Sequence, residues 1–134
     1  MEAEFVELCS DGDLEGVWDA LLSGVDVNSK GRFGYTGLMR ALLNSHTAVA
    51  SFLLEQEGLD IDIVSDCHDM TALWLAAVND QNSECLALIL AKSTSVNKVS
   101  ASGRTALCVA VNNNAVRCVL LLLSDDRCSH VRSD

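Results

Sequence analysis

The chain has 134 residues, enough for one domain in which about two-thirds of the unfolded chain's surface becomes buried. Nineteen acidic against nine basic side chains give a net charge of −10, which disfavours nucleic acid and anionic membranes because their phosphates would be repelled. Aliphatic residues are plentiful, aromatic residues are few and proline is absent, a composition that favours closely packed helices.

The N-terminus and the cysteines indicate a cellular compartment. MEAEFVELCS is acidic, unlike the basic start of a signal peptide, and the longest purely apolar stretch, CVLLLL, is too short to span a bilayer. The six cysteines show no CxxC spacing, and Cys85, Cys108 and Cys118 lie inside apolar runs. We therefore expect buried, reduced thiols in a soluble cytoplasmic protein, with the nucleus as an alternative location.

The predicted helices follow one another in a recurring order. The first two lie in EFVELCS and in residues 12–28, where Leu14, Val17 and Leu21 form one apolar stripe. Three similar phrases then follow, TGLMRAL, TALWLAA and TALCVAV, whose threonines are 35 and 34 positions apart. A second apolar segment comes after each phrase, with apolar residues at helical spacing. The pattern therefore predicts helices in pairs.

Local chemistry supports the helix boundaries. Each phrase begins with a threonine that can cap a helix N-terminus, a contribution of about 1 kcal/mol, and these are Thr36, Thr71 and Thr105. The turns within the pairs hold Gly12, Ser45 and Asn114, which tolerate turn geometry. A single pair cannot bury its own apolar faces, so the pairs must stack on one another.

The residues that carry this pattern resemble the ankyrin repeat, whose period is about 33 residues. The resemblance rests on GDLE and DVN within residues 12–28, on a glycine-containing loop and on three TALxxA-like phrases in register. It covers almost the whole chain and implies an all-α solenoid of stacked helix-turn-helix units with short finger loops. We expect one domain over residues 1–134, with units at about 1–33, 34–68, 69–102 and 103–134, the first a candidate cap.

The chain departs from the family pattern at three places. The family's usual proline after the threonine is replaced by Gly37, Ala72 and Ala106, and Gly37 is expected to soften its helix by about 1 kcal/mol. The family's histidine in the same phrase is replaced by Met39, Trp74 and Cys108. The loop over residues 55–70 and the turn in AAVNDQN hold extra residues, so we expect irregular geometry in the middle of the stack.

Nothing in the sequence predicts catalysis. His46, His68 and His130 lie in separate turns and loops, and neighbouring side chains such as Cys67 and His68 point in opposite directions in an extended loop. Cys128 and His130 supply two of the ligands that a zinc site needs and no second pair accompanies them. We expect neither an enzyme nor a cofactor or metal site.

The resemblance implies that a protein or peptide partner binds the concave surface formed by the finger tips and the inner helices. The positions that it indicates are Arg32, Phe33, Tyr35, Asn44, Cys67, His68, Met70, Asn79, Asp80, Ser102, Arg104, Asn112 and Asn113. Phe33 and Tyr35 are either interface anchors, as aromatic side chains often are, or fold back onto the next unit. Charge there is mixed, so the net charge of −10 does not fix the sign of the partner.

Further alternatives concern single residues and the whole chain. Trp74 is expected to pack between units, and Trp18 to be a partly exposed edge residue. The domain could instead be a substrate-recruiting arm of an enzyme complex, such as a ligase adaptor or a kinase regulator, or a structural spacer. We expect it to be the N-terminal part of a longer protein, and to be a monomer or to self-associate weakly through its C-terminal helix.

Overall fold

Eight α-helices stack as four antiparallel pairs in the part of the chain that the computed structural model describes, residues 2–92 and 96–125. They are α1 (Glu2–Asp11), α2 (Leu14–Leu22), α3 (Gly37–Leu43), α4 (Thr47–Leu54), α5 (Ala72–Ala76), α6 (Ser83–Lys92), α7 (Ala106–Asn112) and α8 (Val116–Ser124). Two 3₁₀ turns accompany them, η1 (Arg32–Gly34) and η2 (Asp80–Asn82). The prediction of an all-α fold is confirmed.

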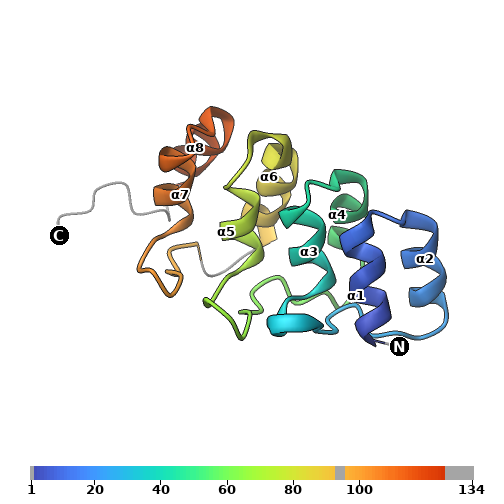
Figure 1. Ribbon diagram of the computed structural model, residues 1–134. Helices are drawn as coiled ribbons and strands as arrows, with labels where there is room; N and C mark the ends of the chain where they lie inside the picture. Colours follow the sequence, from blue (N-terminus) through green and yellow to red (C-terminus); the bar gives the residue numbers. More distant parts are fainter. Residues whose placement is uncertain (1, 93–95, 126–134) are drawn as a thin grey trace.

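The helices form two rows. Helices α1, α3, α5 and α7 contact one another in succession, and α2, α4, α6 and α8 do the same behind them. The loops that join one pair to the next project along one edge of the first row, which we call the inner row (Figure 1). Of the helices in the described ranges, none combines the length and the apolar character that crossing a bilayer requires.

Threonine caps mark where α3, α5 and α7 begin, and turn residues mark where the helices of a pair are joined. The side chains of Thr36, Thr71 and Thr105 accept hydrogen bonds from the N–H three residues further on, at 3.2–3.3 Å. In three of the pairs the turn residue takes a positive φ, namely Gly12, Ser45 and Asn114. The third pair has one extra residue in its turn. In place of a single residue with a positive φ, this turn contains the 3₁₀ turn η2. The expected irregularity in the middle of the stack is confirmed.

The core lies between the two rows and is mainly aliphatic. Leu53, Ile89 and Leu122 of the outer row are fully buried, as the helical spacing predicts. Leu14 of the predicted stripe and Leu88 of α6 are, in contrast, 38% and 42% exposed. Trp18 is 56% exposed, which confirms that it is an edge residue.

A buried asparagine joins the second and third pairs. Asn82, which ends η2, is fully buried, and its Nδ2 donates to the carbonyl oxygen of Leu42 at the end of α3, at 2.9 Å. Its Oδ1 is also buried and has no hydrogen-bond partner among the described residues. The Leu42 carbonyl also accepts from the backbone N–H of Ser45 at 3.1 Å, so the Asn82 amide adds a buried hydrogen bond that links the two pairs.

Candidate partner-binding surface

Three finger loops, residues 31–35, 65–70 and 100–104, lie side by side at the edge of the inner row. Each is closed by a backbone hydrogen bond of 2.8–2.9 Å: Gly31 N–H to Tyr35, Ser65 N–H to Met70, and Ser100 N–H to Arg104. The second finger holds one residue more than the others, which agrees with the lengthened loop seen in the sequence.

Backbone hydrogen bonds also join each finger to the next. The N–H of Cys67 donates to the carbonyl of Phe33 at 3.0 Å, and the N–H of Ala101 donates to the carbonyl of His68 at 2.9 Å. Trp74 adds a side-chain link, since its Nε1–H donates to the carbonyl of Arg104 at 3.0 Å. Trp74 therefore has the structural role expected of it, and the fingers form a connected row.

The first finger carries an aromatic and cationic cluster. Phe33 is 61% exposed, whereas Tyr35 is partly buried against the core. The two rings meet edge to face with their centroids 6.4 Å apart, and the guanidinium carbon of Arg40 lies 4.9 Å from the centroid of Tyr35. The sequence left two alternatives for these rings. Tyr35 folds back onto the core, whereas Phe33 remains exposed at the surface.

The backbone that presents Phe33 is constrained on both sides. Phe33 has a φ of 61°, in the left-handed region that residues other than glycine seldom occupy. Gly34 follows with a φ of 74°, and a Cβ at this position would overlap Asp66 of the second finger. Only glycine fits at 34, so the second finger fixes the shape of the first.

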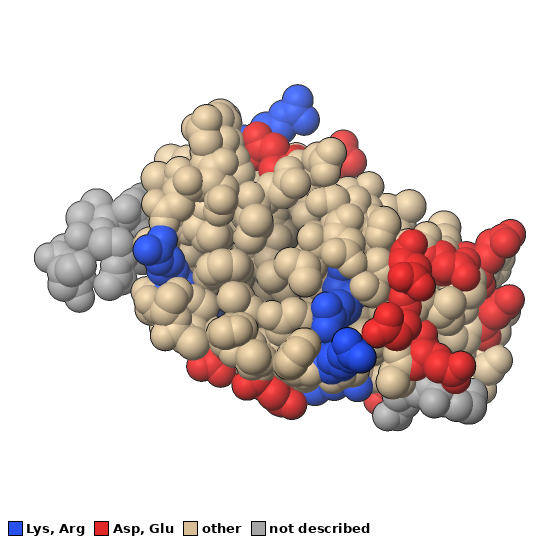
Figure 2. Space-filling model, in the orientation of Figure 1, with Lys and Arg blue, Asp and Glu red and all other residues tan. Residues whose placement is uncertain are grey.

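Charge divides this face of the molecule into two regions. Figure 2 shows Lys and Arg side chains gathered along the lower middle, beside acidic side chains over the N-terminal helices. Within the described residues, no ion pair joins Arg32, Arg40 or Arg104 to a carboxylate. Lys30 differs, because its Nζ lies 3.2 Å from Asp66.

The remaining predicted residues fall into three groups, which are exposed, partly buried or bonded through a side-chain amide. His68, Ser102 and Asn112 are exposed, and Cys67 and Met70 are partly buried. Three amides bond within the fold: Asn44 Nδ2 donates to Ser10, Asn113 Nδ2 donates to the carbonyl of Val109, and Asn79 Oδ1 accepts from Gln81 N–H. Asn44, Asn79 and Asn113 are also exposed, but part of the hydrogen-bonding capacity of each amide is already used within the fold.

Asp80 caps a helix of the next pair. Its carboxylate accepts from the backbone N–H of Arg117 at 3.2 Å and of Cys118 at 3.1 Å, in the first turn of α8. Desolvation pushes the pKa of this carboxyl upward, but these hydrogen bonds and the charge of Arg117 outweigh it and lower the pKa below its usual value. Sequence alone suggested a surface residue, because the helix that Asp80 caps begins 36 positions later.

Replacing Asp80 with Ala should lower the melting temperature by a few degrees at pH 7, because the first turn of α8 loses its acceptor. A lowered pKa in the folded state means that the ionised carboxylate adds stability above the pKa of the unfolded chain, and this stability is lost as the pH falls through the folded pKa. Thermal unfolding followed by circular dichroism at pH 7 and pH 2.5 should show the two proteins converge at the lower pH. If the melting temperatures of the two proteins differ by the same amount at pH 7 and at pH 2.5, the result would contradict a role for the charged cap.

The cysteines within the described residues form no disulfide bond with one another, and several of their thiols are shielded. Burial raises the pKa of Cys9 to about 12. Burial, and then the neighbouring Asp80, raises the pKa of Cys118 to about 12. Both therefore stay protonated at neutral pH and are poor nucleophiles.

No group of three or more potential metal ligands occurs within residues 2–92 and 96–125. Cys128 and His130, the two possible zinc ligands named from the sequence, lie outside the described residues.

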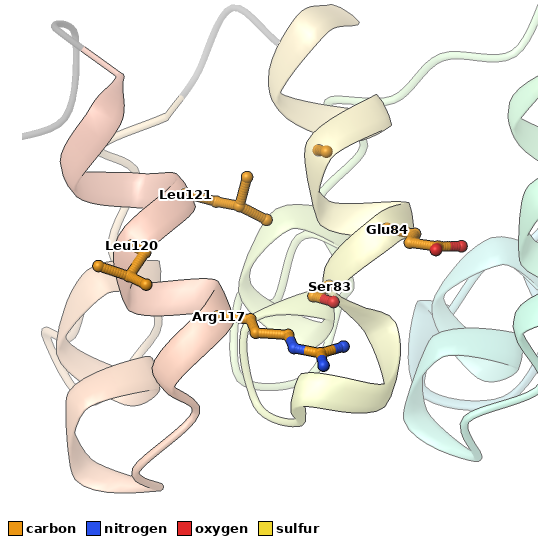
Figure 3. A pocket seen from close by; sticks show the side chains of 6 residues that line it. Ser83, Glu84, Arg117, Leu120 and Leu121 are labelled. Carbon is orange, nitrogen blue, oxygen red and sulfur yellow. The ribbon is translucent and has the colours of Figure 1, made fainter.

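A groove lies on the outer row, which is formed by α2, α4, α6 and α8. Between α6 and α8 a groove of about 350 Å³ is lined by Ser83, Glu84, Ala87, Arg117, Leu120 and Leu121. Figure 3 shows Arg117 extending toward Ser83, with Leu121 directed at α6. Four apolar side chains of α7 and α8 are also exposed in the last pair, namely Val111, Val116, Leu120 and Leu123. Val116, Leu120 and Leu123 belong to α8, the C-terminal helix through which weak self-association is predicted.

Comparison with known proteins places this arrangement in a family. A family model described as ankyrin repeats (three copies) matches residues 5–100, and a model of a single ankyrin repeat matches residues 102–133. Mouse Rabankyrin-5 is 28% identical over 120 residues, which cover 89% of this chain and 10% of that protein. The ankyrin repeat domain-containing protein SAT10 of Stachybotrys chartarum is 33% identical over 122 residues, covering 81% of this chain and 6% of that protein.

The chain thus spans a tenth or less of the curated relatives it matches. Repeats of this kind are generally protein-interaction modules and are typically non-catalytic. The two family matches agree with the structure, which has paired helices, threonine caps and a row of fingers. The chain belongs to the ankyrin repeat family.

Proposed function

We propose that this domain is a protein-interaction module that binds a protein or peptide partner on its concave face, across the finger row and the inner helices. The observation that carries the proposal is the first finger, where an exposed aromatic ring and arginines without carboxylate partners lie on a backbone held by its neighbours. Aromatic and arginine side chains are the commonest sources of binding energy at protein interfaces.

The mechanism proposed is equilibrium binding, in which no covalent bond is made or broken. The connected fingers keep the surface preorganised, so little conformational entropy is lost when a partner binds. A net charge of −10 supports a protein rather than a nucleic acid or an anionic membrane as the partner. We place the protein in the cytoplasm, with the nucleus as an alternative. The role of a recruiting arm in an enzyme complex, or of a spacer, stays the alternative hypothesis.

The test is a comparative pull-down from cell lysate with mass-spectrometric identification. The concave variant changes Phe33, Tyr35, His68 and Arg104 to Ala, and circular dichroism first verifies that it is folded. A matched control changes four exposed side chains of the outer row to Ala, namely Asp19, Glu55, Glu84 and Leu88. We expect partners that are retained by the wild type and by the control but are lost with the concave variant.

Partners retained by the concave variant and lost with the outer-row control would move recognition to the outer row, including the groove between α6 and α8. Identical lists for all three proteins would favour the spacer hypothesis. Sedimentation of the wild-type chain at several concentrations should accompany the pull-down, because self-association through the exposed residues of α7 and α8 would compete for the same protein.

A further inference from the structure

We propose that the first finger recognises a partner segment in which an acidic side chain stands beside a large apolar one, and that Phe33 is present for this contact at a cost to stability. The inference rests on the proposed function of the concave face and specifies the chemistry of its partner. Two independent observations carry it, the strained backbone of an exposed aromatic residue and the pattern of charges around it.

The first observation concerns Phe33. Its left-handed backbone, with a φ of 61°, is unfavourable for a residue with a Cβ, and Asn or Gly would adopt it more readily. A strained residue is usually compensated by what its side chain buries, but this ring is 61% exposed. The backbone itself is needed, because the Phe33 carbonyl accepts from Cys67 and Gly34 fits closely against Asp66. The fold therefore requires the conformation, whereas the phenyl ring is mostly exposed and its aromatic contact within the described residues is the edge-to-face pair with Tyr35.

The second observation concerns charge. The chain carries 19 acidic and nine basic side chains, so a surplus of carboxylates is available to pair with every arginine. Arg32 is nevertheless exposed without a carboxylate of the described residues beside it, and Arg40 lies over the ring of Tyr35 instead. Arg32 thus precedes Phe33 in the chain and Arg40 lies over Tyr35, and neither guanidinium group is paired with a carboxylate of the described residues. An incoming carboxylate could accept from either, since guanidinium groups bind carboxylates through paired hydrogen bonds.

The neighbourhood limits how acidic the segment can be. Glu4, Glu7 and Asp11 of α1 are exposed, and α1 packs directly against α3, which carries Arg40. In Figure 2 the acidic and basic regions adjoin on this face. A long run of carboxylates would extend over α1 and be repelled. The occupant that fits is therefore one acidic residue next to an apolar side chain that packs on Phe33.

The experiment uses a random 12-residue peptide library displayed on phage and selected against the whole chain. Enriched peptides are synthesised with a fluorescent label, and their affinities are measured by anisotropy. We expect Asp or Glu within two positions of Leu, Ile, Phe or Trp in the enriched set. Four proteins are compared, namely the wild type, Phe33→Asn, Arg32→Glu and, as a control with the same change in charge at another exposed site, Lys98→Glu.

Arg32→Glu should weaken binding about tenfold or more and Lys98→Glu less than about twofold, because Arg32 belongs to the first finger and Lys98 does not. Phe33→Asn should also weaken binding about tenfold or more, while its melting temperature stays equal to or above that of the wild type. A purely structural role for the ring would instead lower the melting temperature of Phe33→Asn. That result, or equal effects of Arg32→Glu and Lys98→Glu, would overturn the inference.

The failure of this inference and that of the proposed function are distinguishable. Peptides that lose affinity with Phe33→Asn but carry no acidic residue would leave the concave face as the binding site and refute the acidic partner. Peptides that bind all four proteins equally would refute both proposals. A selection that enriches nothing above the Phe33→Asn background would also count against both.

Discussion

Replacing Asn82 with Asp should lower the free energy of unfolding by about 3–5 kcal/mol at pH 7, because it places an unpaired charge in the core. The side chain is fully buried, and its Nδ2 donates to the carbonyl oxygen of Leu42 at 2.9 Å. An aspartate has the same shape but would turn an oxygen toward that carbonyl. Its other oxygen would occupy the place of Oδ1, which has no hydrogen-bond partner among the described residues.

The penalty should depend on pH. A protonated Asp can donate to the Leu42 carbonyl and is uncharged, so burial would raise the pKa of this carboxyl in the folded variant. In the unfolded chain the carboxyl has its ordinary pKa of about 3.9. Below that value both states are protonated and the charge costs nothing; the cost grows as the pH rises toward the raised folded pKa.

Urea unfolding at pH 3.5 and pH 7 measures the pH dependence of this loss of stability. Three proteins are compared, namely the wild type, Asn82→Asp and Asn82→Leu. Asn82→Leu removes the amide donor and adds no charge, while the Leu42 carbonyl keeps its hydrogen bond from Ser45 N–H, so this variant should cost about 1 kcal/mol at both pH values. Asn82→Asp should approach the wild type at the lower pH. Equal, pH-independent losses in the two variants would show that the buried amide acts only by filling space.

The sequence predicts the features of this fold that depend on local chemistry. The threonine caps and the turns at Gly12, Ser45 and Asn114 could be placed because each uses groups within a few residues. The irregular third pair was also foreseen from its extra residue. The 3₁₀ turn η2 itself could not be predicted from the sequence. It is stabilised by the hydrogen bond from Asn82 to Leu42, which lies 40 positions earlier.

The candidate surface was harder to resolve for the same reason. Phe33 and Tyr35 are two positions apart and chemically alike, and only the packing of the neighbouring fingers separates the exposed ring from the partly buried one. Asp80 is a charged residue in a turn, so the sequence indicates a surface position. Its hydrogen-bond partners, however, lie 37 and 38 positions away. Contacts between repeats, which a single unit does not encode, decide these roles.

Gly37→Ala is a case in which local propensity and packing give opposite expectations, and packing should prevail. Helix propensity favours Ala over Gly by about 1 kcal/mol. A Cβ at Gly37, however, would lie 2.6 Å from Cys9 Sγ and 3.1 Å from Phe5 Cε2, both in fully buried side chains of α1. Overpacking of this kind costs about 1–3 kcal/mol, so the variant should be less stable than the wild type.

The cause can be isolated with a double-mutant cycle measured by urea unfolding. Cys9→Ala removes the sulfur atom that meets the new methyl group, so Cys9→Ala with Gly37→Ala should be more stable than the sum of the single changes by about 1 kcal/mol or more. Ala106, at the equivalent position of the last pair, already has a Cβ and supplies the control. Ala106→Gly should cost about 1 kcal/mol, as propensity alone dictates. Additive losses at Cys9 and Gly37 would contradict the clash, and Gly37 would then soften its helix as local rules predict.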